Sequence, residues 1–305
     1  MKAIQIKQYG DTSVLELVDI PQPTPQADEV LIRVKATSFN PVDAKIRQGY
    51  LKDQMPMQLP LLMGWDCAGV VESVGAQVTD FAVGDAVYGY PDFMHGGTYA
   101  EYFCINTSQI AIKPAGLDFA QAAALSMTGQ AALTCLNIAN VSAGQRVLIH
   151  GGAGGVGSLA IQMAKARGAY VITTASGDAI AEVRQLGADE VIDYKTTAFQ
   201  DVVHDVDVVI DTLGGETQDN SWGVLKRGGV LVTLVNPPSA EKAAAAGVSA
   251  QFVFTQPNAQ ALQAMNQMVD AGQLRVNVGA TIALEEAHLA HEGKAGKGKI
   301  VMVLA

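Results

Sequence analysis

The chain has 305 residues, of which 49% are hydrophobic and 16% are charged, and its formal net charge is −10. This composition indicates a folded globular protein, and the length favours two domains. The negative charge argues against nucleic acid as a partner, because the phosphates would be repelled. No run of about 18 apolar residues is present and the first residues favour a strand over a signal peptide, so we expect a cytoplasmic protein without a membrane span.

The three cysteines, Cys67, Cys104 and Cys135, are scattered along the chain. Their odd number and wide spacing argue against a disulfide framework and against a C-x-x-C metal site.

The first third of the chain is rich in β-branched residues, glycine and proline. Apolar and polar residues alternate in residues 2–7 and 29–35, the period of half-buried strands. Further apolar runs at residues 69–74 and 85–90 are separated by turn residues. These short strands predict a small β domain, as in a partly open barrel.

From about residue 118 the pattern changes, because residues 119–139 are alanine-rich with a helical period. Strands are predicted in chain order at residues 147–149, 170–174, 190–192, 207–211, 230–234 and 251–254. Their alternation with helices predicts a doubly wound parallel sheet. After a helix at residues 258–271, short strands at 279–284 and 299–304 are expected to rejoin the first domain.

A glycine-rich turn joins the strand at residues 147–149 to a predicted helix at 156–167. Gly152, Gly154 and Gly157 match G-x-G-x-x-G in the strand–turn–helix context that this motif requires. Such a turn lets the backbone approach a pyrophosphate, and the helix N-terminus favours its charge. An ordinary strand-to-helix turn is the alternative. The residues predicted to bind a dinucleotide are Gly152, Ala153, Gly154, Gly155, Val156 and Gly157.

The end of the second strand of this sheet indicates which dinucleotide binds. NAD-binding folds place a carboxylate there on the ribose 2′-hydroxyl, but residues 170–174 lead into Ser176 instead. Ser176 can donate a hydrogen bond to a 2′-phosphate that a carboxylate would repel, so NADPH is predicted. We interpret Asp178 as complementing a helix dipole. Tyr194 is expected at the adenosine end, although packing explains it equally well.

Several segments together resemble the medium-chain dehydrogenase/reductase superfamily, in its zinc-free quinone oxidoreductase (zeta-crystallin-like) branch. The segments are residues 40–50, 64–71, 83–85, 97–102 and the glycine turn, and the likeness covers the whole chain. It implies an α/β protein with two domains. One is a GroES-like, partly open β-barrel catalytic domain of residues 1–117 and 256–305, and the other is a Rossmann domain with a doubly wound parallel sheet, residues 118–255.

The chain departs from the zinc-containing relatives at their ligand positions. Those enzymes have a cysteine where this chain has Asn40, and a histidine and a glutamate where it has Trp65 and Asp66. Their third ligand falls near Ala124, so the resemblance implies no tetrahedral zinc site. The short segment at residues 85–98 also leaves no four-cysteine lobe for structural zinc.

Without a Lewis acid, stabilising an alkoxide is harder than delivering a hydride to an electron-poor acceptor. We therefore expect an NADPH-dependent reductase of quinones or α,β-unsaturated carbonyls, without metal or flavin. By the resemblance, Asn40, Tyr50 and Thr128 would face the substrate, and Asp43 would support the early loop. Tyr50 is a candidate for proton relay, or equally a loop anchor. Asn236 follows a predicted strand at the sheet edge where cofactors bind.

The last part of the chain carries histidines and lysines that invite a functional interpretation. His288 and His291 lie three residues apart on a predicted helix, which without further ligands is not a metal site. Lys294, Lys297 and Lys299 are interpreted as a solvated turn, or as the positive charge that a 2′-phosphate would need.

Two other functions stay open. One is a zinc-independent alcohol or aldehyde dehydrogenase of the same fold, and the other is a non-enzymatic NADPH-binding protein, crystallin-like or a redox sensor. The resemblance also implies a homodimer that pairs edge strands. Residues 229–235 are uncharged with high β propensity and would pair if exposed at an edge, but a buried central strand explains them equally well.

Overall fold

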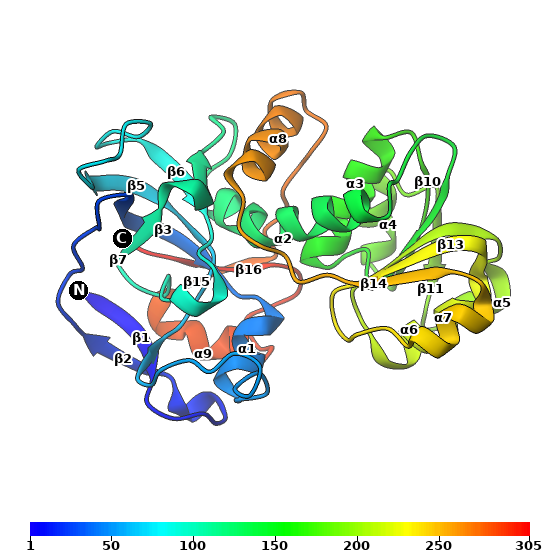
Figure 1. Ribbon diagram of the computed structural model, residues 1–305, viewed down its shortest axis with the longest axis horizontal. Coiled ribbons are helices and arrows are strands. Elements are labelled where there is room, and N and C mark those ends of the chain that lie inside the picture. Colours follow the sequence, from blue (N-terminus) through cyan, green and yellow to red (C-terminus); the bar gives the residue numbers. More distant parts are fainter. The chain divides into compact units, whose positions relative to one another are not determined.

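The computed structural model describes residues 1–305, and the chain divides into two compact units (Figure 1). Unit 1 comprises residues 1–127, 256–270 and 276–305, and unit 2 comprises residues 128–255 and 271–275. The division falls inside helix α2 (Phe119–Ile138), whereas the boundary predicted at residue 118 precedes that helix. Because α2 is alanine-rich and apolar on all sides, it has no polar face that would confine it to one unit.

Unit 1 is built on a seven-stranded sheet with the order β15-β16-β3-β5-β6-β8, in which β7 also pairs with β3. The strands are β3 (Glu29–Ser38), β5 (Cys67–Val74), β6 (Ala86–Gly89), β7 (Tyr102–Asn106), β8 (Ile110–Ile112), β15 (Ala280–Ala283) and β16 (Ile300–Val303). Strand β3 is central because β5, β7 and β16 all pair with it antiparallel. The last strands of the chain thus join the first domain, as predicted.

A second sheet and several short helices complete unit 1. The sheet has the order β2-β1-β4, from β1 (Lys2–Ile6), β2 (Glu16–Asp19) and β4 (Leu61–Leu62). The α-helices are α1 (Pro41–Arg47), α8 (Ala259–Asp270) and α9 (Ala287–His291). The 3-10 helices are η1 (Thr12–Val14), η2 (Phe93–His95), η3 (Thr107–Gln109) and η5 (Leu284–Glu286).

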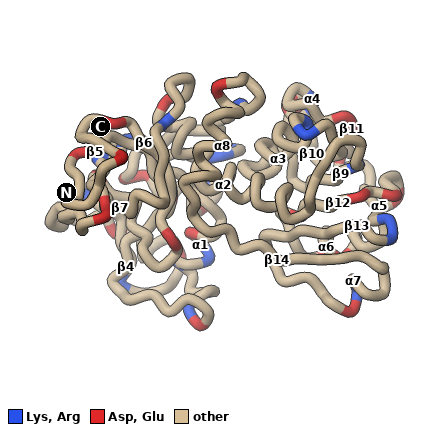
Figure 2. Tube along the Cα trace, turned by 45° about the horizontal axis from the view of Figure 1, so that its top comes forward, with Lys and Arg blue, Asp and Glu red and all other residues tan.

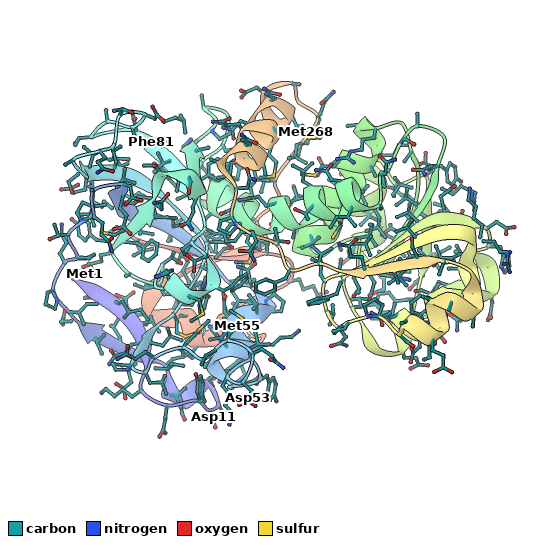
Figure 3. The ribbon with its side chains drawn as sticks, viewed as in Figure 1. Met1, Asp11, Asp53, Met55, Phe81 and Met268 are labelled. Atoms are coloured by element: carbon teal, nitrogen blue, oxygen red, sulfur yellow. The ribbon has the colours of Figure 1, made fainter.

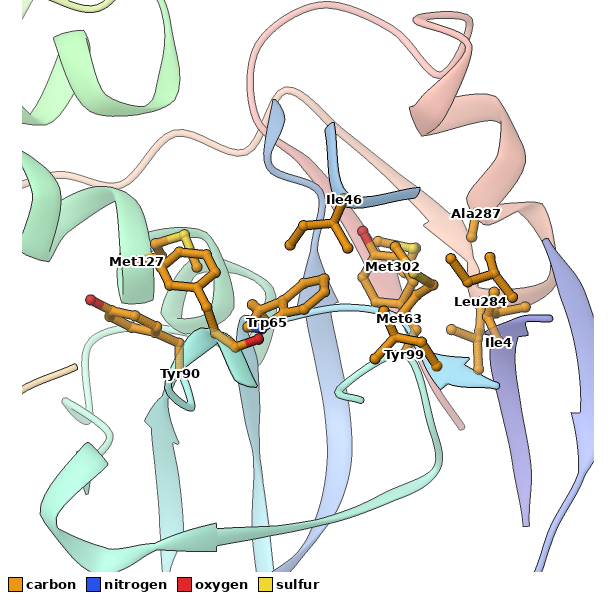
Figure 4. Close-up of a cluster of buried hydrophobic side chains, with 13 residues drawn as sticks. Ile4, Ile46, Met63, Trp65, Tyr90, Tyr99, Met127, Leu284, Ala287 and Met302 are labelled. Atoms are coloured by element: carbon orange, nitrogen blue, oxygen red, sulfur yellow. Dashed lines mark hydrogen bonds between the residues drawn. The ribbon is translucent and has the colours of Figure 1, made fainter. Parts of the chain in front are cut away.

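Trp65 lies in the middle of an apolar cluster of unit 1 (Figure 4). Its side chain is fully buried together with Met63 and Tyr99. The indole N–H donates a hydrogen bond to the carbonyl oxygen of Phe93 at 3.3 Å. Gly96 leaves room for the ring, because a Cβ there would lie 2.5 Å from its carbon atoms. Where zinc-containing relatives place a histidine ligand, this chain therefore has a core residue.

Unit 2 is a six-stranded parallel sheet with the order β11-β10-β9-β12-β13-β14. Its strands are β9 (Arg146–Ile149), β10 (Tyr170–Ala175), β11 (Glu190–Asp193), β12 (Val206–Asp211), β13 (Leu225–Thr233) and β14 (Ser249–Phe252). The helices are α3 (Gly155–Ala166), α4 (Ala179–Gln185), α5 (Phe199–Val202), α6 (Gly215–Ser221), η4 (Trp222–Val224) and α7 (Ala240–Ala246). The doubly wound sheet is confirmed, and its order reverses between β9 and β12, the place where ligands bind in such folds.

Strand β13 lies between β12 and β14, so residues 229–233 pair on both sides. The interpretation of this segment as a buried central strand is confirmed, and its interpretation as an exposed edge is wrong. The sequence of an uncharged run with high β propensity does not indicate whether one or two neighbouring strands pair with it. The exposed edges of the sheet are β11 and β14.

Charged residues are scattered along the chain in both units, without an extended basic tract (Figure 2). None of the helices is both long and apolar enough to cross a membrane.

Candidate active site

The glycine turn between β9 and α3 needs glycine at several of its positions. A Cβ on Gly157 would lie 2.2 Å from the carbonyl oxygen of Gly151, and one on Gly152 would lie 2.2 Å from the hydroxyl of Thr173. Gly154 is different, because it is exposed and a Cβ there would meet only one atom, at 3.2 Å. Packing within the protein does not demand glycine at Gly154, whereas a closely approaching ligand would.

The start of helix α3 fits an anionic group. Gly154 is its N-cap and has no side chain that could accept from the first turn, and that turn contains no acidic residue. The N–H groups of Gly155, Val156 and Gly157 therefore have no intrahelical acceptor and lie at the positive end of the helix dipole. With half-buried Ala153 before them, these residues can hold the pyrophosphate of a dinucleotide.

Ser176 and Tyr194 are neighbours at the carboxyl edge of the unit 2 sheet. They follow Ala175 and Asp193, which are opposite each other in the parallel pair β10 and β11. The backbone N–H of Tyr194 donates to Ala175 at 3.3 Å. The Tyr194 side chain is 59% exposed, so it is accessible to a ligand at this edge.

Two more predicted residues belong to unit 2. Asn236 is exposed on the loop after β13, at the same edge of the sheet. Thr128 is buried within α2. The structure thus brings the glycine turn, Ser176, Tyr194 and Asn236 to one sheet edge, while Asn40 and Tyr50 belong to unit 1.

Asn40 is buried immediately before α1, and both ends of its amide are held. Its Nδ2 donates to Oδ2 of Asp66 at 2.7 Å, and its Oδ1 accepts from Nζ of Lys299 at 2.5 Å. One amide proton of Asn40 is left for another acceptor, so this side chain can still donate to a substrate oxygen.

Asp66 and Lys299 form an ion pair inside unit 1, with 3.2 Å between Nζ and Oδ2. The carboxylate is fully buried and also accepts from the hydroxyl of Ser38 and, at 2.8 Å, from the backbone N–H of Met127. Lys299 donates its remaining bond to the carbonyl oxygen of Phe39 at 2.9 Å. A buried ion pair is tolerated only with such additional hydrogen bonds.

The interpretation of Lys299 as part of a solvated turn, or as a cation for a 2′-phosphate, is wrong. Its side chain is buried in unit 1 because β16 pairs antiparallel with β3, with Val301 opposite Ser38. This register sets Lys299 opposite Asn40. Local sequence around Lys299 resembles an exposed turn, and only the pairing of strands far apart in the chain reveals the contact.

The residues at the zinc-ligand positions of metal-containing relatives are thus used otherwise. Asn40 and Asp66 bind an ammonium, and Trp65 belongs to the apolar core. Nowhere in the chain do three His, Cys, Asp or Glu side chains gather so that they could hold a metal ion.

Asp43 supports the backbone of Asn40, as the resemblance implied. Its Oδ2 accepts from the Asn40 N–H at 2.8 Å and from the hydroxyl of Tyr99 at 2.9 Å, whereas Oδ1 has no partner. Complete burial raises the pKa of Asp43 to about 7. Burial and the neighbouring Asp43 also raise the pKa of Tyr99, so that this phenol stays a donor.

His291 is a half-buried hydrogen-bond acceptor, a role that sequence reasoning missed. Its Nδ1 accepts from Nε of Arg47 at 3.2 Å, and Arg47 also donates to the carbonyl oxygen of Gly10 at 2.7 Å. Burial, with the Arg47 charge, lowers the pKa of His291 to about 3. The neutral imidazole packs edge-on against Tyr99, the side chain that also donates a hydrogen bond to Asp43.

Tyr50 is the most accessible of the three predicted catalytic side chains, at 70% exposure. It follows α1, where its N–H donates to the carbonyl oxygen of Lys45 at 3.0 Å. The loop continues to Asp53, which lies at the periphery of unit 1 (Figure 3). An exposed phenol on a loop can meet a ligand without rearrangement of the core.

We expect Asp43→Asn to remove a loss of stability at high pH. Because the pKa of Asp43 is raised to about 7, the folded protein keeps a proton that the unfolded chain releases near pH 4, and the stability from this proton is lost as the pH rises towards 7. Asparagine can accept the same two bonds without charge. In urea unfolding from about pH 4 to about pH 8, the free energy of unfolding of the variant should rise relative to that of the wild type by at most about 1.4 kcal/mol per pH unit. A difference independent of pH would contradict this.

Lys299→Met should destabilise the protein by about 3–5 kcal/mol, because it leaves the Asp66 carboxylate buried without its cation. Lys297→Met is the matched control, since that lysine is exposed and its loss should change the free energy of unfolding by less than about 0.5 kcal/mol. Adding Asp66→Asn to Lys299→Met should recover part of the loss. Equal urea midpoints for the two lysine variants would refute the role of the ion pair.

Comparison with known proteins agrees with this architecture. A model of the alcohol dehydrogenase GroES-like domain matches residues 26–115, and a model described as zinc-binding dehydrogenase matches residues 186–302. The solved structure of the quinone oxidoreductase from Coxiella burnetii superposes with a TM-score of 0.92 and 38% identity, covering 100% of this chain and 99% of that chain.

Two curated relatives are similar over most of the chain. The chloroplastic NADPH-dependent alkenal/one oxidoreductase of Arabidopsis thaliana is 39% identical over 290 residues, which cover 90% of this chain and 71% of that protein. The quinone oxidoreductase of Sus scrofa is 34% identical, covering 100% of this chain and 98% of that protein. The chain therefore belongs to the quinone oxidoreductase branch of the medium-chain dehydrogenase/reductase superfamily.

Proposed function

We propose that this protein is an NADPH-dependent reductase that transfers a hydride to quinones or to α,β-unsaturated carbonyls without metal or flavin. The observation that carries the proposal is the buried group of Asn40, Asp66 and Lys299, which supplies an amide donor and an ammonium at the ligand positions of metal-containing relatives. The names of the curated relatives, quinone oxidoreductase and alkenal/one oxidoreductase, support the substrate class.

The residues of unit 2 would hold the cofactor. The N–H groups at the start of α3 bind the pyrophosphate, with Gly154 leaving space for it. Ser176 and Tyr194 offer hydroxyl donors to the 2′-phosphate, and no carboxylate directly follows β10 to repel it. Asn236 contributes from the loop after β13. When bound, the nicotinamide supplies the hydride.

The residues that act on the substrate have separate tasks. The free amide proton of Asn40 donates to the acceptor's carbonyl oxygen, where negative charge develops. Lys299 and Asp66 hold that amide in place, and the nearby ammonium favours the developing charge. Tyr50 delivers a proton to the reduced product, and Thr128 is a further hydroxyl donor.

We further propose that the enzyme works as a homodimer in the cytoplasm. Strand β14 supports the dimer because it pairs with β13 on one side only. Its last residue, Phe252, is 38% exposed, and an uncovered edge strand invites pairing with a second copy.

A cofactor-paired activity screen tests the proposed reaction. NADH and NADPH are each combined with 9,10-phenanthrenequinone, an enone, an aldehyde and, in the oxidising direction with NADP⁺, an alcohol. We expect oxidation of NADPH with the quinone or the enone only. Turnover of simple alcohols would favour the zinc-independent dehydrogenase, and tight NADPH binding without any turnover would favour a non-enzymatic binding protein.

Ser176→Asp should reverse the cofactor preference. The carboxylate would repel a 2′-phosphate and accept from a 2′-hydroxyl, so kcat/KM with NADPH should fall about 10- to 100-fold while that with NADH rises. Ser176→Ala is the control, because it removes one hydrogen bond without adding charge and should lower kcat/KM with NADPH about tenfold at most. An unchanged ratio of the two cofactors in Ser176→Asp would show that another residue selects the cofactor.

Phe252→Lys should shift the protein towards a monomer in sedimentation experiments, because two lysines would meet where the edge strands pair. Leu17→Lys, at a similarly exposed apolar position in unit 1, should leave the mass unchanged. A wild type that sediments as a monomer at all concentrations would overturn the proposed dimer.

A further inference from the structure

Asp211 ends strand β12 and is fully buried. Its Oδ1 accepts from the backbone N–H groups of Leu213 at 3.0 Å and Gly214 at 2.8 Å. Its Oδ2 accepts from the hydroxyl of Thr233 at 2.9 Å and from Nε2 of Gln218 at 3.1 Å. The carboxylate is therefore satisfied by four neutral donors, and none of them is a cationic side chain.

These contacts join the loops that follow two neighbouring strands. Gln218, on α6, also donates from Nε2 to the carbonyl oxygen of Asn236 at 3.2 Å. Thr233, at the end of β13, accepts from the N–H of Val235 at 3.3 Å. Asp211 thus holds the loop after β12 directly and the loop after β13 through Gln218 and Thr233.

Gly214 brings the two loops into contact. Its backbone has φ 70° and ψ −165°, a conformation that is essentially restricted to glycine. A Cβ at this position would lie 2.8 Å from Cγ1 of Val235 and 3.0 Å from Nδ2 of Asn236. A side chain on residue 214 would therefore displace Asn236.

The loop after β12 also touches the glycine turn. The hydroxyl of Thr212 donates to the carbonyl oxygen of His150 at 2.8 Å, just before that turn. The sheet order reverses between β9 and β12, and dinucleotides lie across that point. With the adenosine half on the β10 side, beside Ser176, the other half extends over the loops after β12 and β13.

We propose that Asp211 is a positioning residue for the nicotinamide half of the dinucleotide, acting through Gly214 and Asn236. This inference rests on the proposed function, because it presupposes that a nicotinamide dinucleotide binds. Asp211 itself lies beneath the loops and contacts no ligand. Its carboxylate holds the two loops at the spacing that the nicotinamide ribose and ring require.

Asp211→Asn tests the proposal, because an amide keeps the shape but presents a donor where the native group accepts. Calorimetry compares two probes, NADPH and adenosine 2′,5′-bisphosphate, which contains only the adenosine half. We expect the Kd for NADPH to rise about tenfold or more, the loss of a hydrogen bond or two, while the Kd for the bisphosphate stays within about twofold. The kcat with a quinone should fall as well, because a misplaced ring reacts slowly.

Asp207→Asn is the matched control, since Asp207 lies at the other end of β12, where it binds Lys226 and the Arg146 N–H. It should leave both Kd values unchanged. Equal weakening of both probes in Asp211→Asn, or no weakening of either, would overturn the positioning role.

Gln218→Leu provides a second variant if Asp211→Asn does not fold. It leaves the bonds that Asp211 accepts from Leu213, Gly214 and Thr233 intact. It removes the bonds from Gln218 to Asp211, Thr233 and Asn236, and with them the link between the two loops through this side chain. The same separation of NADPH from bisphosphate affinity is expected, and parallel changes would count against the proposal. A wild type that binds neither probe would refute the proposed function itself, and the inference with it.

Discussion

The buried ion pair between Lys299 and Asp66 is the interaction on which the account of unit 1 depends. It ties β16, near the end of the chain, to the loops after β3 and before β5, so the first domain is complete only when the last strand has paired. The same ammonium holds the amide of Asn40. Since desolvating two charges is costly, their retention in this interior points to a role that apolar residues could not fill, and we propose that this role is to orient Asn40.

In unit 2, neutral hydrogen-bond donors rather than an ion pair satisfy the buried carboxylate of Asp211. The glycine turn needs Gly152 and Gly157 for its own geometry, and we propose that Gly154 leaves room for a closely approaching ligand. On the other side of the reversal in strand order, Asp211 holds two loops through backbone and side-chain donors. Rigid strands thus carry loops whose positions are set by buried polar groups, an arrangement suited to binding an extended dinucleotide.

Local pattern was enough to predict most of the fold. The strands and helices of unit 2 follow from apolar runs, helical period and the glycine turn, all of which are short-range signals. Local pattern could not predict the contacts between segments that are far apart in the chain. Lys299 resembles an exposed lysine in its local sequence, and His291 resembles a surface helical residue until Arg47 is placed beside it. For the same reason the segment ending β13 did not reveal whether one strand or two would flank it.

The central claim is that an amide and an ammonium, rather than a metal ion, accompany hydride transfer from NADPH. The most direct measurement uses NADPH deuterated at the transferable position of the nicotinamide, an enone substrate, and protein dialysed against a strong chelator. The account predicts one deuterium on the β-carbon of the product, found by mass spectrometry, at a rate that chelation does not change. Product without deuterium, or activity that chelation abolishes and zinc restores, would contradict it.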